Sequence, residues 1–218
     1  MKKIYADCAA TTKISDKAKE AMLSAFEIYG NPSSLHTFGV EAARLLTLIE
    51  DIIRLSQLDE NVELAWENLD IAKMASDTAA LLRDTAEKKN VKINLDCEPT
   101  EIYGVRQLYS EIIYNLCENA IKYNKDGGSV TVSTHPKNGG IELTVSDTGI
   151  GIPPEHRSRV FERFYRVDKS HSKATGGTGL GLSIVKHAVQ YLGGQIDLTS
   201  RVGEGTKITV FFPNKEWE

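Results

Sequence analysis

Four polar side chains at helical spacing are the first feature of the sequence that could do chemistry: Asn115, Asn119, Lys122 and Tyr123. A helix turns about 100° per residue, which places the last three about 40°, about −20° and about 80° from Asn115, on one face. Amide oxygens suit Mg²⁺, which binds in proteins together with water and substrate phosphates. The face therefore predicts a magnesium and phosphate site. The alternative is an ordinary solvated helix face. Asparagine is a poor choice for such a face, because it is a weak helix former.

A second motif runs from Asp147 to Gly151 and follows a predicted strand. Gly149 and Gly151 allow the backbone to approach a flat ligand closely. Asp147 could accept a hydrogen bond from an exocyclic amine. A tight turn capped by the aspartate side chain explains the same residues equally well.

A third motif, the glycine-rich stretch 176–181, opens a predicted helix. Successive backbone N–H groups at a helix N-terminus form an anion site suited to phosphates. No Gly-Lys-Ser or Gly-Lys-Thr follows, so the stretch is not a P-loop. It also lacks the first βα unit of a dinucleotide-binding fold. A flexible loop is the alternative interpretation.

Aromatic residues lie between the second and third motifs. Phe161 and Phe164 stand at helical spacing, and the polar stretch 167–175 follows them. Such a pair is more often core than ligand contact. Here we expect it to anchor one end of a mobile lid.

The elements that must position these motifs alternate between helix and strand. Two strand pairs are predicted as hairpins, and the whole as an α+β sandwich with one mixed sheet and helices on one face. Predicted helices cover 77–89, 105–122 and 182–192, and predicted strands cover 91–95, 129–133, 141–145, 195–199 and 206–212. Upstream we expect a helix over 15–30 and another over about 41–58. The second is either an amphipathic helix on a core or one half of a helical hairpin.

Composition limits the class of protein. The chain has 218 residues, 26 Lys and Arg against 30 Asp and Glu, and a net charge of −4. An acidic chain of this length predicts one domain with a short attachment and no broad nucleic-acid binding. No apolar run reaches the ~20 residues of a membrane helix. Three scattered cysteines without metal-ligand spacing indicate reduced thiols in a cytoplasmic protein.

In this order and spacing, the motifs closely resemble the catalytic ATP-binding domain of sensor histidine kinases, in the GHKL superfamily. Residues 115–124 resemble its N box, 147–151 its G1 box, 161–164 its F box and 177–181 its G2 box. The resemblance covers about 45–213 and implies a Bergerat-type sandwich, preceded by a helical segment, that binds Mg-ATP.

The resemblance also implies roles for single residues. Asn119 and Asn115 would coordinate Mg²⁺, Lys122 would face the phosphates and Tyr123 the adenine, and Asp147 would accept the adenine amine. The remaining ATP-binding residues implied are Gly149, Gly151, Arg166, Lys173, Gly177, Thr178, Gly179, Leu180, Gly181 and Thr206.

The phosphoacceptor side of the family pattern is missing. Residues 45–60 resemble the second helix of the dimerisation hairpin, but none of the five histidines stands in a phosphoacceptor motif. We therefore expect Mg-ATP binding, weak dimerisation and no autophosphorylation in cis. In the parent kinase, a phosphoacceptor histidine domain and a response regulator would be the partners. The alternatives are a nucleotide-binding module without kinase activity and, less favoured, a chaperone or topoisomerase ATPase.

Residues 1–44 carry a different resemblance, to the amino terminus of a cysteine desulfurase. The segments 5–12 and 30–39 resemble that family, although Cys8 stands where asparagine is common. The Schiff-base lysine and the catalytic cysteine of that family would lie later, so a cysteine desulfurase fragment is an unfavoured alternative function for the chain. Both patterns fit 41–45, where we place a junction. The predicted parts are a desulfurase-like fragment (1–44), a hairpin remnant (45–60) and the ATP-binding domain (61–218), an apparent chimera.

Overall fold

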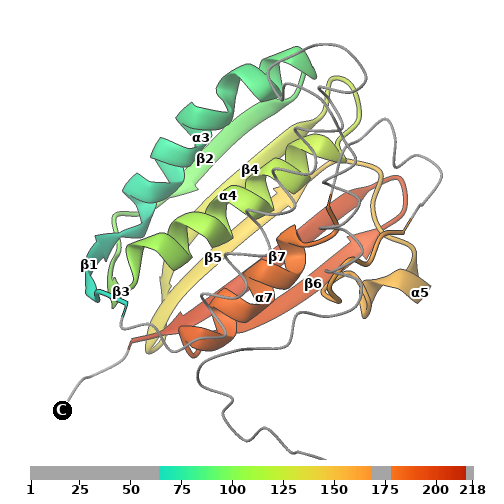
Figure 1. The fold of residues 1–218 in the computed structure, drawn as a ribbon. Helices are drawn as coiled ribbons and strands as arrows, with labels where there is room; N and C mark the ends of the chain where they lie inside the picture. Colours follow the sequence, from blue (N-terminus) through green and yellow to red (C-terminus); the bar gives the residue numbers. More distant parts are fainter. Residues whose placement is uncertain (1–63, 168–177, 215–218) are drawn as a thin grey trace, which may run out of the picture. The chain divides into compact units, whose positions relative to one another are not determined.

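The computed structural model describes residues 64–167 and 178–214, and its centre is a five-stranded mixed sheet with helices on one face (Figure 1). The strand order is β2-β4-β5-β7-β6; β2 runs parallel to β4 and the other neighbours are antiparallel. The strands are β2 (Lys92–Cys97), β4 (Ser129–Lys137), β5 (Gly140–Asp147), β6 (Gln195–Arg201) and β7 (Gly205–Pro213). The predicted α+β sandwich is confirmed.

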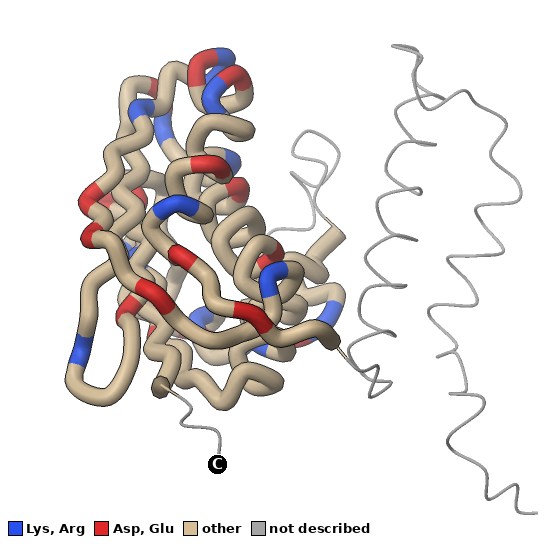
Figure 2. Tube along the Cα trace, turned by 90° about the vertical axis from the view of Figure 1, so that its left-hand side faces the viewer, with Lys and Arg blue, Asp and Glu red and all other residues tan. Residues whose placement is uncertain are grey.

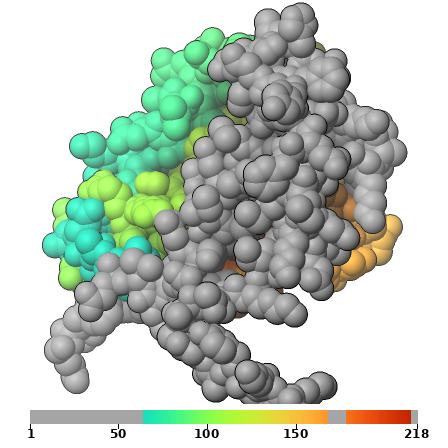
Figure 3. All heavy atoms as spheres, in the orientation of Figure 1, coloured from blue at the N-terminus to red at the C-terminus, as the bar shows by residue number. Residues whose placement is uncertain are grey.

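Three helices cover the sheet: α3 (Ile71–Lys88), α4 (Arg106–Lys122) and α7 (Gly181–Tyr191). The core between the two layers is apolar because alternate strand residues point toward the helices. Val132, Leu143 and Val210 are each fully buried there. In the orientation of Figure 1, atoms of α3 and α4 lie side by side on the visible surface (Figure 3).

Helix α3 begins at Ile71, six residues before the predicted start at 77. The reason is an N-cap that the prediction missed: the Asp70 side chain accepts a hydrogen bond from Lys73 N at 3.0 Å. Such a cap satisfies a backbone donor that the first helical turn leaves open. The helix therefore begins at Ile71, directly after the capping residue Asp70.

Two short strands also escaped prediction, β1 (Glu67–Asp70) and β3 (Glu101–Gly104). They pair antiparallel with each other outside the main sheet, with Leu69 opposite Ile102. Both of these side chains are buried. Four residues are too few for a readable alternation, which is why the pattern predicts neither strand.

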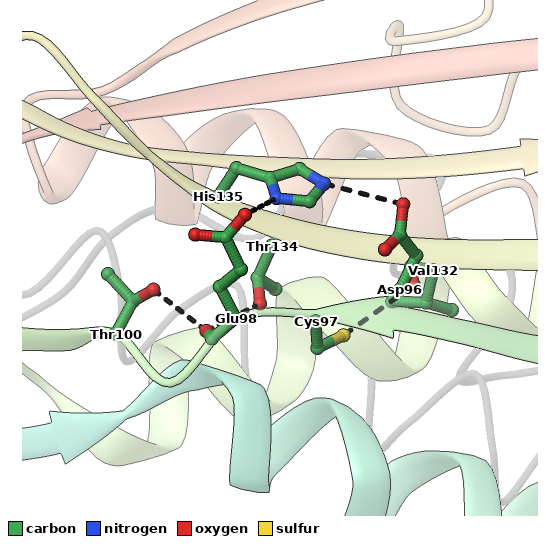
Figure 4. A network of polar contacts seen from close by, with 7 residues as sticks. All are labelled: Asp96, Cys97, Glu98, Thr100, Val132, Thr134 and His135. Atoms are coloured by element: carbon green, nitrogen blue, oxygen red, sulfur yellow. Dashed lines mark hydrogen bonds and ion pairs between the residues drawn. The ribbon is translucent and has the colours of Figure 1, made fainter.

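The outer face of the sheet is polar. His135 on β4 contacts two acidic residues: its Nδ1 lies 3.0 Å from Oε1 of Glu98, just after β2, and its Nε2 lies 3.5 Å from Oδ2 of Asp96 on β2 (Figure 4). These groups are exposed, so the ion pairs contribute little to stability. A view turned by 90° shows basic and acidic residues interspersed along the described chain (Figure 2).

The predictions for residues 1–63 lie outside the described residues, as do those for the stretch 168–177. This applies to the helices expected over 15–30 and 41–58. Among the described residues, no helix is long and apolar enough to cross a membrane.

Candidate nucleotide-binding site

Helix α4 presents the polar face that the sequence predicts. Asn115, Asn119 and Lys122 are half-buried, and the Tyr123 side chain directly after the helix is 38% exposed. The residues expected on the opposite face are all buried, namely Ile113, Leu116, Cys117, Ala120 and Ile121. The helix therefore packs its apolar side on the core and leaves the carboxamides and the ammonium on the other side.

The start of α7 lies directly against the carboxamides of α4. A Cβ atom on Gly181 would stand 2.8 Å from Asn115 Oδ1 and 3.6 Å from Asn119 Nδ2. Asn115 Nδ2 donates to the carbonyl oxygen of Glu111 at 2.8 Å. That bond fixes the amide orientation and places Oδ1 beside the helix start. Glycine at 181 is what permits this approach.

The Asn119 carboxamide is the uncommitted member of the pair. Within the described part of the chain its side chain makes no hydrogen bond. A half-buried amide costs free energy when it is left without a partner, so such a group is suited to a ligand. The oxygen atoms of Asn115 and Asn119 form a donor set of the kind that Mg²⁺ accepts.

Asp147, at the end of β5, has one carboxylate oxygen held in place. Its Oδ1 accepts from Gly149 N at 2.7 Å and from Thr206 N at 3.3 Å. Among the described residues, all hydrogen bonds of this side chain go to Oδ1, which leaves Oδ2 for a ligand. Burial raises the pKa of Asp147, and the two backbone N–H groups oppose this rise. The bond to Gly149 is also the capped turn that the sequence offered as an alternative, so both interpretations hold for this residue.

The glycines around Asp147 allow close contact between loops. A Cβ on Gly149 would overlap the carbonyl oxygen of Tyr123, which also accepts from Ile150 N at 3.1 Å. Gly151 has φ +69, and a Cβ there would overlap the Arg201 carbonyl. The turn after β5 therefore lies against the end of α4 on one side and the end of β6 on the other.

Sequence analysis missed Ser200, a buried residue that joins these loops. Its Oγ accepts from Ile152 N at 2.8 Å and donates to the Gly205 carbonyl at 2.9 Å. The same atom lies 2.9 Å from Thr206 Oγ1. The available signal was a serine at an inward position of a strand, where an apolar residue is expected, because an inward polar side chain needs a partner.

The aromatic motif, residues 161–164, lies in the turns that follow α5 (Pro154–Arg157) and not on a helix. Tyr165 Oη is 2.6 Å from His156 Nδ1, and the Arg159 guanidinium stands 4.3 Å from the Tyr165 ring. Phe161 is half-buried and the Phe164 side chain is 37% exposed. Phe164 is therefore the more exposed of the two phenylalanines.

Charged side chains reach the tyrosine after α4. Burial raises the pKa of the Tyr123 phenol, and the positive charge of Arg166 opposes that rise. The Lys122 ammonium is 5.8 Å from the Tyr123 ring centroid. The structure therefore brings the expected lid arginine to the same region as the helix face.

The remaining predicted residues stand as follows. Gly181 is the first residue of α7, Leu180 is its N-cap residue, and Gly179 and the half-buried Thr178 precede them. Lys173 and Gly177 lie outside the described residues.

Comparison with known proteins shows the family to which the chain belongs. Residues 104–216 match the family described as histidine kinase-, DNA gyrase B- and HSP90-like ATPase. The chain belongs to this ATPase family. The matched range holds α4, the Asp147 turn and the start of α7, so the family resemblance and the observed site coincide.

Relatives within this family include sensor kinases. The chain is 37% identical over 201 residues to the sensor-like histidine kinase SenX3 of Mycolicibacterium smegmatis, covering 89% of this chain and 51% of that protein. It is 35% identical over 179 residues to the phosphate regulon sensor protein PhoR of Pseudomonas aeruginosa, covering 79% and 39%. The chain thus spans about half or less of the length of these relatives.

Solved structures agree with the fold. The mycobacterial sensor histidine kinase MprB superposes with a TM-score of 0.61 at 28% identity, over 70% of this chain and 100% of that one. Full-length ShkA, solved in complex with AMPPNP, superposes with a TM-score of 0.70 at 24% identity, over 94% of this chain and 41% of that one.

Proposed function

We propose that this chain is the Mg-ATP-binding catalytic part of a sensor histidine kinase, and that it transfers the γ-phosphoryl group of ATP to a histidine. The observation that carries the proposal is the Asp147 carboxylate. One of its oxygens is held by two backbone N–H groups, while the other is left for a hydrogen bond. A fixed acceptor at the base of a glycine turn suits an exocyclic amine.

The nucleotide would lie between this acceptor and the start of α7. In this placement the adenine amine would donate to Asp147, with Tyr123 near the ring and Gly149, Gly151 and Thr206 around the base. The phosphates extend toward Lys122 and the backbone N–H groups of 177–181. Arg166 and Lys173 would supply further positive charge, since catalysis of phosphoryl transfer rests on positioning and charge stabilisation.

Asn115 and Asn119 would hold the magnesium ion. Its chemistry is to neutralise the charge that develops on the phosphate oxygens. The donor set fits, because Mg²⁺ is usually held by few protein oxygens together with phosphates and water.

The phosphoacceptor histidine would come from a separate dimerisation domain, and a response regulator would then take the phosphoryl group. The described histidines are held in other contacts: His135 by Glu98, His156 by Tyr165, and His187 by Arg163. Because none of the five histidines stands in a phosphoacceptor motif, we infer no autophosphorylation in cis. We also propose weak dimerisation, since half of the hairpin is missing, and activity in the cytoplasm.

A fluorescent ATP analogue tests the binding half of this proposal. We expect ATP to displace it from the purified chain in the presence of Mg²⁺, and Asn119→Ala and Asp147→Asn to weaken both ligands. His135→Ala is the matched control, because β4 rises ~3.3 Å per residue and places His135 ~20 Å along the strand from Ser129, at the site. No displacement by ATP would overturn the proposal.

Labelled ATP tests the transfer half. A supplied hairpin domain bearing a phosphoacceptor histidine should acquire acid-labile phosphate, while this chain should not. Binding without any transfer would leave a nucleotide-binding module. Acid-labile phosphate on this chain alone would contradict the inference about cis phosphorylation.

The composite origin of the chain remains a hypothesis of its own. We propose that residues 1–44 derive from a cysteine desulfurase, joined at 41–45. The match to SenX3 of Mycolicibacterium smegmatis covers 89% of the chain, whereas the matches to SenX3 of Mycobacterium bovis and Mycobacterium tuberculosis cover 80%, which is the share that follows residue 44. Sequencing source DNA across codons 40–48 decides the matter, since two separate loci would exclude a natural fusion.

A further inference from the structure

A buried polar cluster, formed by Asn124 and Thr148 around the backbone of Ser129, ties the end of α4 to the turn after β5. Asn124 is 6% exposed and Thr148 is half-buried. The proposed nucleotide contacts assign no role to either side chain. Their contacts show what the cluster holds in place.

The Asn124 carboxamide uses its full hydrogen-bonding capacity, two donors and two acceptor positions. Its Nδ2 donates to the carbonyl oxygens of Ala120 at 3.0 Å and Ser129 at 2.9 Å. Its Oδ1 accepts from Lys125 N at 3.0 Å and from the Thr148 hydroxyl at 3.3 Å. A buried amide satisfied from four directions is fixed in orientation, and it fixes the four groups in turn.

Thr148 forms hydrogen bonds with both backbone groups of Ser129, the first residue of β4. Its Oγ1 accepts from Ser129 N at 2.9 Å, and its backbone N–H donates to the Ser129 carbonyl at 3.1 Å. The hydroxyl proton then has two acceptors in reach, Asn124 Oδ1 at 3.3 Å and the Ser129 carbonyl oxygen at 3.5 Å, of which Asn124 is the nearer. Ser129 is therefore the common partner of both side chains.

The backbone of Gly128 lies directly against the side chains of Asn124 and Thr148. A Cβ on Gly128 would overlap Asn124 Oδ1 and would lie 2.9 Å from Thr148 Oγ1. The loop before β4 consequently packs its backbone directly on the two side chains. Small shifts of either side chain must therefore move backbone as well.

The position of the cluster in the chain gives it a functional consequence. Asn124 directly follows Tyr123, and Thr148 directly follows Asp147. Linking Asn124 to Thr148 therefore sets the separation of the two groups that would bracket the base.

We infer that Asn124 and Thr148 are positioning residues that hold Asp147 where it selects a purine with an exocyclic amine. This inference rests on the proposed function and deepens it. It predicts an effect on the amine contact alone, which a role in stability would not produce.

The experiment compares two nucleotides on the purified chain, ATP and purine riboside 5′-triphosphate, which lacks the 6-amino group. Both are measured by displacement of the fluorescent analogue at fixed Mg²⁺. In Thr148→Val we expect ATP affinity to fall roughly tenfold, the order expected when a buried hydrogen-bonding group loses its partner. The affinity for the analogue without the amine should change little. Thr148→Ser keeps the hydroxyl and should keep the ATP preference.

Two further variants make the result decisive. Asn124→Ala should reduce the ATP preference as Thr148→Val does, with thermal melting used to check that each variant is folded. Asn119→Ala, on the phosphate side, should weaken both nucleotides equally and leave their ratio unchanged.

Equal losses for both nucleotides in Thr148→Val and Asn124→Ala would overturn the inference and leave the cluster a merely structural role. A wild-type chain that binds ATP but does not prefer it over the amine-free nucleotide would also overturn it. A wild-type chain that binds neither nucleotide would overturn the proposed function itself.

Discussion

The backbone N–H of Phe164 donates a hydrogen bond to the carbonyl oxygen of Gly179 over 2.9 Å, joining the chain on the two sides of residues 168–177. Both residues have positive φ, +63 for Phe164 and +74 for Gly179. A phenylalanine in this region is strained, and such strain persists only where the surroundings hold it. The bond therefore fixes the aromatic turn against the start of α7, beside the proposed phosphate site.

Gly179→Ala should weaken nucleotide binding. A Cβ would stand 3.0 Å from the Phe164 carbonyl carbon and 3.0 Å from Tyr165 O, at a φ that alanine adopts only with strain. We expect the contact with Phe164 to open and the Kd for ATP to rise. The control is Gly139→Ala, in the β4–β5 turn, where φ is +77 and nothing lies within 4 Å of the added carbon. Equal Kd values for the two variants would contradict this reading.

Gly205→Ala should destabilise the domain more than Gly203→Ala does. Both positions have positive φ, so each substitution should cost about 1 kcal/mol or more in backbone strain. Only at Gly205 would the added carbon overlap the Asp147 carbonyl, while nothing lies within 4 Å at Gly203. Urea unfolding measures the difference in the free energy of unfolding. ATP titration should show a loss for Gly205→Ala alone.

Base recognition should depend on pH through Asp147. Burial raises the pKa of this carboxyl. As pH falls, it takes up a proton earlier than an ordinary aspartate, and the protonated carboxyl is a weaker acceptor that also presents an O–H donor to the adenine amine. The preference for ATP over purine riboside triphosphate should disappear in that acidic window. A preference that persists down to the ordinary aspartate pKa would count against the assignment.

The same raised pKa makes the stability of the nucleotide-free domain depend on pH in the opposite direction to base recognition. The folded state binds the proton more tightly than the unfolded chain, so the stabilisation from the protonated form is complete below the unfolded pKa. It is lost as pH rises through the folded pKa. Asp147→Asn should therefore stabilise the nucleotide-free domain at neutral pH while it weakens ATP binding. Thermal melts with and without Mg-ATP report both effects, and a lower melting temperature without nucleotide would refute the first.

Cys117 should resist alkylation in the folded domain. Burial raises the pKa of its thiol to about 12, with a smaller contribution from Cys97. The thiolate is the reactive form, so little of it exists near pH 8. Iodoacetamide followed by peptide mass spectrometry should find Cys117 labelled only in denaturant. The half-buried Cys97 is the internal comparison, and equal labelling rates in the native state would be the contrary result.

Much of the fold could be predicted because the spacing of apolar residues along the chain indicates its helices and strands. The face of α4 follows from a turn of about 100° per residue, and its five apolar positions are all buried. The alternation over 129–133 and 141–145 predicted β4 and β5, and both strands extend beyond those ranges. The start of α3 and the strands β1 and β3 were missed, because a side-chain cap and four-residue strands leave almost no periodic signal.

The sequence by itself determined the polar face of α4, the glycine turns and the residue types able to meet a nucleotide. Only the tertiary structure decided that Thr206 N holds Asp147 Oδ1, that Gly181 lies on Asn115, and that Asn124 and Thr148 share Ser129. The physical reason is that helix and strand periods depend on neighbours along the chain. Contacts between loops depend instead on sheet register and on backbones approaching more closely than a Cβ allows.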